Sequence, residues 1–102
     1  MKIAVAAMAP KVDAQIAVHS ARAPYFLLFN EQGEMLEVVS NPVAETDRGA
    51  APRAALLLAD KGVTLLAAGD FGPRFVAELE QRGIDQIQRS GQVSDIVRQL
   101  ID

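Results

Sequence analysis

Residues 24–40, PYFLLFNEQGEMLEVVS, decide the fold of this 102-residue chain. They begin with a nearly continuous apolar run, Pro24–Phe29, which is typical of a strand covered on both faces. Asn30–Gly33 then supply turn residues, with Gly33 able to take a positive φ, and Met35–Ser40 reads as a returning strand. The segment therefore predicts a β-hairpin, which puts one antiparallel strand into the sheet.

Strands and helices alternate in the rest of the chain. Further strands are predicted at Lys2–Ala7 and Val63–Ala68 and, at an edge of the sheet, at Ile84–Gln88. A first helix begins near Pro52, buries Ala54, Ala55 and Leu58, and ends at Gly62; a second begins at Pro73, buries Phe75, Val76 and Leu79, and ends at Gly83. A third is marked by a helical apolar repeat, Val93, Ile96, Val97, Leu100 and Ile101.

This order, β-β-β-α-β-α-β-α, restricts the topology. The β-α-β crossovers require parallel strands, whereas the hairpin requires an antiparallel one. The sequence therefore predicts the α/β class, with a mixed five-stranded sheet and helices on both of its faces.

Composition excludes several classes of function. The net charge of −3, with ten basic and thirteen acidic residues, argues against general nucleic-acid binding, which needs a dense basic face. The absence of cysteine excludes disulfides and thiolate-held metals. No continuous apolar span reaches membrane length, so we expect one soluble, cytoplasmic domain over residues 1–102, with neither nucleic acid nor membrane as a partner.

Three loops of the predicted fold meet at the carboxyl ends of the parallel strands, where open α/β sheets bind ligands. The first follows strand Lys2–Ala7, the second precedes the first helix, and the third is Gly69–Pro73. Two helix N-termini point to the same edge, and their unpaired N–H groups favour an anion. The candidate site residues on these loops are His19, Arg22, Arg48, Gly49, Gly69, Gly72 and Arg74.

Simpler interpretations of these residues stay open at this point. A lone histidine in a polar loop, here the stretch from Ala9 to Ala23, is more often solvated than functional. The sequence Gly69–Pro73 is a good strand–turn–helix connection but lacks the glycines and Lys-Ser/Thr of a phosphate loop. The carboxylates Asp13, Glu45 and Asp47 show no acid–base pairing by spacing, and no catalytic triad is visible, so an enzyme is disfavoured.

Five features, taken in order, give a family resemblance. They are MKIAVA at the start, VHSARAPYFLLF at residues 18–29, the Asn-Pro pair at residues 41–42, AAGDFGPRF at residues 67–75, and GID at residues 83–85 before the last helix. Together they resemble the dinitrogenase iron–molybdenum cofactor biosynthesis family, which includes NifX, the cofactor-binding domain of NafY and the C-terminal region of NifB. The resemblance covers essentially the whole chain.

The resemblance implies both a fold and a function. The fold is a ribonuclease H-like, three-layer α/β/α sandwich, with sheet order 3-2-1-4-5 and strand 2 antiparallel, in a single NifX-like domain. The function is that of a carrier, not an enzyme: it transiently holds an anionic iron–sulfur or iron–molybdenum cofactor, or its precursor, and passes it between cofactor-assembly and acceptor proteins. His19 matches the family's histidine and is implied as the metal ligand or contact.

The sequence also departs from the family pattern. Ser20-Ala21 stands where the family has Phe-Gly, and Asp47–Ala50 holds fewer glycines than the family's run before the first helix. Two alternatives follow: an adaptor or regulatory domain that keeps the fold without a cluster, and a binder of a molybdenum–copper sulfide cluster, similar to the orange protein of sulfate reducers. An enzyme acting on phosphate esters at the Gly69 turn ranks third.

Overall fold

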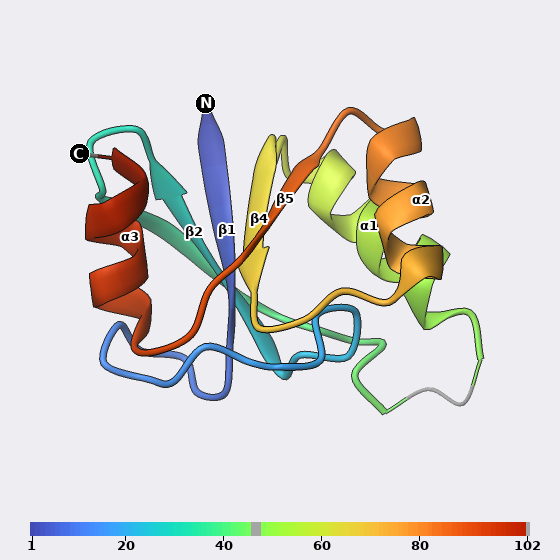
Figure 1. Cartoon of the computed structure of the whole chain (residues 1–102), viewed down its shortest axis with the longest axis horizontal. Coiled ribbons are helices and arrows are strands. Elements are labelled where there is room, and N and C mark those ends of the chain that lie inside the picture. The colour runs from blue at the N-terminus through green and yellow to red at the C-terminus, as the bar shows by residue number, and fades with distance from the viewer. Residues whose placement is uncertain (46–47, 102) are drawn as a thin grey trace.

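A computed structural model of the chain describes residues 1–45 and 48–101 and contains one five-stranded sheet between helices (Figure 1). The strands are β1 (Lys2–Ala7), β2 (Tyr25–Asn30), β3 (Met35–Ser40), β4 (Leu65–Ala68) and β5 (Asp85–Gln88). The helices are α1 (Ala50–Asp60), α2 (Pro73–Gln81) and α3 (Val93–Ile101). None of these helices is long and apolar enough to cross a membrane.

The sheet has the predicted topology. Its strand order is β3-β2-β1-β4-β5, with β2 antiparallel to both of its neighbours and with β1, β4 and β5 parallel. Helices α1 and α2 cover one face and α3 covers the other (Figure 1). The predicted α/β class, strand order and antiparallel second strand are confirmed.

Two hydrophobic clusters stabilise the three layers, one on each face of the sheet. Side chains of β1 alternate between them, so that Ala4 and Ala6 belong to the α1–α2 side and Ile3 and Val5 to the α3 side. All four are fully buried, as the continuous apolar runs of β1 and β2 predict for strands covered on both faces.

The structure shifts some predicted boundaries. Helix α1 begins at Ala50, so Pro52 lies inside its first turn, where its missing N–H costs no hydrogen bond. Strand β4 begins at Leu65 and not at Val63, because the Val63 N–H donates to the Leu58 carbonyl at 3.1 Å and closes the end of α1. In α2 the predicted core residue Val76 is only half-buried.

Part of the predicted polar loop from Ala9 to Ala23 lies in the core. Ile16 packs into the cluster on the α3 side, whereas Ala17 and Ala23 pack into the cluster on the α1–α2 side. Adjacent residues that face opposite sides are typical of an extended strand. This loop is therefore held firmly against the sheet, and it carries the histidine.

Candidate functional site

The loop between β1 and β2 carries His19 along the carboxyl ends of the central strands (Figure 1). Its backbone pairs in parallel with the residues that follow β4. The N–H groups of Gly69 and Asp70 donate to the carbonyls of Ala17 and Val18 at 2.8 and 2.9 Å. This pairing continues as a bridge between His19 and Asp70, so both side chains arise at the same edge of the sheet.

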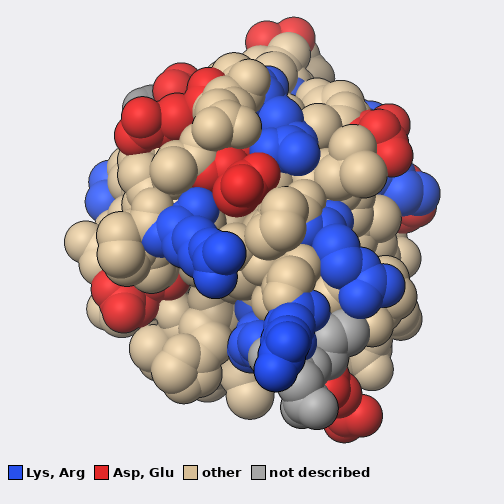
Figure 2. Space-filling model, turned by 90° about the vertical axis from the view of Figure 1, so that its right-hand side faces the viewer, with Lys and Arg blue, Asp and Glu red and all other residues tan. Residues whose placement is uncertain are grey.

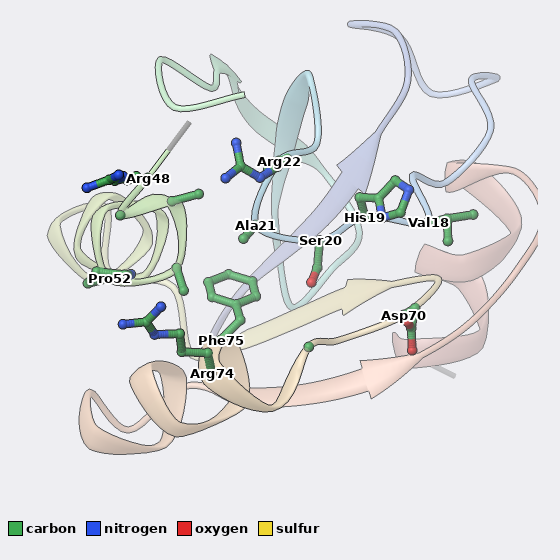
Figure 3. A pocket seen from close by; sticks show the side chains of 14 residues that line it. Val18, His19, Ser20, Ala21, Arg22, Arg48, Pro52, Asp70, Arg74 and Phe75 are labelled. Carbon is green, nitrogen blue, oxygen red and sulfur yellow. The ribbon is translucent and has the colours of Figure 1, made fainter. Parts of the chain in front are cut away.

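A cleft of about 680 Å³ opens between this loop and the first turns of α1 and α2 (Figure 3). The cleft brings together residues that are far apart in the sequence, as the sheet topology predicts. Six of the seven candidate site residues line it: His19, Arg22, Arg48, Gly49, Gly72 and Arg74.

Gly69, the seventh candidate, is not among the residues that line the cleft. A Cβ at this position would lie 2.8 Å from the Cα of Val18 and 3.3 Å from the carbonyl oxygen of Ala17. Glycine is therefore required where these two backbone segments cross closely. Gly69 positions the His19 loop by this backbone contact without lining the cleft.

Two helix N-termini face the cleft, as predicted. The N-cap residues are Gly49 for α1 and Gly72 for α2, and neither helix has a side-chain cap. The first-turn N–H groups of a helix without such a cap remain available to solvent or to a ligand, and the helix dipole adds a partial positive charge. Ala50 and Ala51 in the first turn of α1 also line the cleft.

The side chains add to this positive field. The described lining contains three arginines, Arg22, Arg48 and Arg74, against one carboxylate, Asp70. The whole chain carries a net charge of −3, so this basic excess is local. Seen from the side of α1 and α2, Lys and Arg side chains lie across the centre and lower part of the face, whereas acidic ones lie mainly toward its outline (Figure 2). The cleft therefore favours an anionic ligand.

The cleft has two chemically different ends (Figure 3). Arg48 and Arg74 lie at the end formed by the helices, and Arg22 points toward that end from the loop between β1 and β2. His19, whose side chain is exposed, lies at the other end with Asp70. The Asp70 carboxylate accepts a hydrogen bond of 3.1 Å from the Gln88 side-chain amide, which ties this end to β5. One end thus offers charge and hydrogen-bond donors, and the other offers an imidazole that can bind a metal.

The sequence analysis named Asn41 only as part of the Asn-Pro pair and assigned it no role in the site. Its side-chain amide donates to the carbonyls of Ala21 and Ala23, both at 2.9 Å, and its oxygen accepts from the Val43 N–H at 3.2 Å. Asn41 is 7% exposed and therefore anchors the His19 loop from inside the protein. The Asn-Pro pair after β3 is the only sequence signal that could have indicated it.

Two other lining residues also escaped the sequence analysis as site residues. Phe75, predicted only as a core residue, is 2% exposed and contributes an apolar surface to the cleft. Ser20 is 4% exposed and lies between His19 and Phe75 in Figure 3. Both are placed by tertiary packing, which a local sequence pattern does not encode.

The other candidate carboxylates lie elsewhere. Asp13 and Glu45 do not line the cleft, and Asp47 is outside the described residues. Within residues 1–45 and 48–101, no group of three or more His, Cys, Asp and Glu side chains could hold a metal ion. The donor set of the cleft therefore fits an anion or a metal-containing anion contacted by one imidazole.

Comparisons with known proteins agree with this geometry. The family described as dinitrogenase iron–molybdenum cofactor matches residues 1–102. Among solved structures, the apo form of the orange protein from Desulfovibrio gigas is similar, with a TM-score of 0.91 and 28% identity over 99% of this chain and 87% of that one. A NifB-like Thermotoga protein of the DUF35 family is similar with a TM-score of 0.82 and 26% identity, over 97% and 85% of the two chains. No curated protein sequence gives a significant match.

Proposed function

This chain belongs to the dinitrogenase iron–molybdenum cofactor family, and we propose that it carries an anionic iron–sulfur or iron–molybdenum cluster, or a precursor of one. The carried cluster is cargo, taken from a cofactor-assembly protein in the cytoplasm and released to an acceptor. Residues 1–102 act as a single binding domain, and the role is not catalytic.

One observation carries this proposal: His19 and three arginines from separate segments line the same cleft. The imidazole of His19 is exposed, so it can bind a metal atom of the cargo. Arg22, Arg48 and Arg74 would offset the cargo's negative charge. The uncapped first turns of α1 and α2 supply further N–H donors.

The same donor set suits release as well as binding. The sequence contains no cysteine, so no thiolate ligand fixes the cluster. Soft thiolates are the strongest protein ligands for iron–sulfur clusters, whereas one imidazole with electrostatic contacts holds the cargo less tightly. A carrier has to give up its cargo, and this site would allow it.

A second cargo is favoured by one comparison. The structure resembles the apo orange protein along almost its whole length, at 28% identity. The same cleft would then hold a molybdenum–copper sulfide cluster, which is also anionic. The identity of the metal that is taken up distinguishes the two cargoes.

The test is cluster uptake by protein purified without oxygen. The protein is incubated with ferrous iron and sulfide, or with thiomolybdate and copper, and then desalted; visible absorption and metal per chain are measured. We expect uptake by the wild type and binding at least about tenfold weaker, or about 1.4 kcal/mol, for His19→Ala. Arg74→Ala should also weaken uptake.

Arg98→Ala is the matched control, because Arg98 is an exposed arginine of α3 that pairs with Asp95 and does not line the cleft. It should take up as much cluster as the wild type. Equal uptake by wild type and His19→Ala would remove His19 from the role. If the wild type takes up no cluster, the chain is better explained as an adaptor, which should then copurify with a stable partner.

A further inference from the structure

Three exposed arginines lie where α1 and α2 begin, at the outer edge of the cleft. Arg48 precedes α1 and Arg74 lies in the first turn of α2, and both line the cleft (Figure 3). Arg53 lies within α1 and does not line the cleft. Its side chain runs back toward the start of the helix, because a Cβ on Gly49 would lie 3.7 Å from the Arg53 Cδ. We call Arg48, Arg53 and Arg74 the arginine rim.

The arginine rim has no ionic partner within residues 1–45 and 48–101. None of its three side chains forms an ion pair or a hydrogen bond with a described residue. Other cations of the chain are paired: Arg82 contacts Glu78 at 2.7 Å, and Lys61 contacts Glu37 at 2.5 Å. The rim therefore presents positive charge that the described part of the protein leaves uncompensated.

The position of Arg53 indicates that this charge serves more than the cargo. A cluster inside the cleft reaches Arg48 and Arg74, whereas Arg53 lies outside the lining. A ligand that contacts all three arginines must therefore extend beyond the cleft, as the surface of a partner molecule would. Acidic side chains lie toward the outline of the same face, and the chain has a net charge of −3 (Figure 2). This distribution favours a protein over a nucleic acid, which needs a dense basic face.

We propose that the arginine rim is the docking surface for a carboxylate-rich surface of the protein that receives the cargo. The inference rests on the proposed function, which supplies the acceptor protein as the partner. Guanidinium groups pair with carboxylates in a bidentate geometry. Each exposed pair contributes little, so docking depends on several charges that act together and speed the encounter.

Docking at this surface also favours release of the cargo. Arg48 and Arg74 line the cleft and belong to the rim, so cargo and partner compete for the same two guanidinium groups. Carboxylates that pair with them reduce the positive field that holds an anionic cluster. The acceptor therefore weakens the binding of the cluster at the moment when it is in position to take it.

The docking surface is tested on cluster-free protein, with a hexaglutamate peptide as the probe and a hexaglutamine peptide as its control. NMR titration of ¹⁵N-labelled protein measures both the affinity and the site. The wild type should bind only the acidic peptide, with the largest shifts in the first turns of α1 and α2. Arg53→Ala should bind it about twofold to fivefold more weakly, as expected for one exposed ion pair. Raising NaCl from about 0.05 M to about 0.3 M should weaken binding further.

Two further variants make the result specific. Arg53→Glu reverses the charge and should bind the acidic peptide more weakly than Arg53→Ala, since like charges then meet. Arg98→Ala changes an exposed arginine of α3 that pairs with Asp95 and should bind like the wild type. Circular dichroism verifies that each variant is folded, and alanine at position 53 favours the helix.

Cluster-loaded protein tests the coupling to release. Arg53→Ala should take up as much cluster as the wild type, because Arg53 does not line the cleft. It should need about twofold to fivefold more peptide to release half of the cluster. Cluster that stays bound at saturating peptide would contradict the assignment to an acceptor.

Other outcomes overturn the docking surface itself. No binding of the acidic peptide by the wild type would do so, and so would equal affinities of the wild type and both Arg53 variants. An RNA oligonucleotide of equal charge that binds more tightly than the peptide would assign the surface to nucleic acid instead. Failure of cluster uptake alone overturns the proposed function and leaves the peptide result, which is measured without cluster, standing.

Discussion

At the scale of single residues, the geometry of the cleft depends on Gly69, which never touches it. Its N–H donates to Ala17 at 2.8 Å, and its missing side chain lets the Val18 backbone cross the end of β4. The backbone beside His19 is thus fixed by a contact between main chains. A side chain at Gly69 would have to push that backbone away.

We therefore expect Gly69→Ala to destabilise the protein by about 1–3 kcal/mol, as overpacking does, and to weaken cluster uptake. Gly72→Ala is the matched control, because a Cβ there meets nothing within 4 Å and the φ of −68° suits alanine. Its stability should change by less than about 0.5 kcal/mol. Urea unfolding of both variants measures the difference, and equal midpoints would contradict the role assigned to Gly69.

The residues of the site differ in how far the sequence predicts them. The position of His19 and the arginines follows from the strand order, because loops at the carboxyl ends of parallel strands meet at one edge. The placement of Ser20 in the cleft and the anchoring of the loop by Asn41 do not follow from it. Both depend on how the chain between β1 and β2 folds back on itself. Buried and exposed residues follow one another there without a regular period, so the sequence pattern predicts only a polar loop.

At the scale of elements, the site joins a loop, a strand end and two helix ends. Asn41 directly follows β3 and holds the loop that carries His19 through two hydrogen bonds. Gly49 and Gly72 begin the two helices without a side-chain cap. The alternation of strands and helices was predictable from apolar periodicity, whereas the start of β4 was not, because the end of α1 engages Val63.

Asn41→Ala should lower the free energy of unfolding by about 2–3 kcal/mol, since it leaves the buried carbonyl of Ala23 and the partly buried carbonyl of Ala21 without donors. It should also weaken cluster uptake, because the His19 loop loses its anchor. Asn30→Ala is a suitable comparison: Asn30 also makes side-chain hydrogen bonds, to Gln32 and Glu34, but in the turn between β2 and β3.

Asn30→Ala should lower stability without changing uptake per folded chain. Chemical unfolding and metal analysis on the same samples separate the two effects. An Asn41→Ala protein that is as stable as the wild type and takes up cluster normally would show that the loop needs no anchor.

At the scale of the whole molecule, a chain of net charge −3 concentrates basic groups at one edge of its sheet. The sequence predicted the layers and the mixed sheet because β1 and β2 are apolar on both faces. The full strand order came from the family resemblance, since several arrangements satisfy the same crossovers. The cleft's volume and its division into two ends could come only from the packed structure.

The central claim is that a metal of the cargo is bound at His19, and the sequence offers a direct way to test it. His19 is the only histidine, so protein labelled with ¹⁵N-histidine carries the label in one imidazole. Pulsed electron paramagnetic resonance of the labelled protein, loaded with a reduced and paramagnetic cluster, detects any bond between the cluster and that ring. We predict a hyperfine coupling to a single ¹⁵N-imidazole; a loaded protein without such coupling would contradict the account.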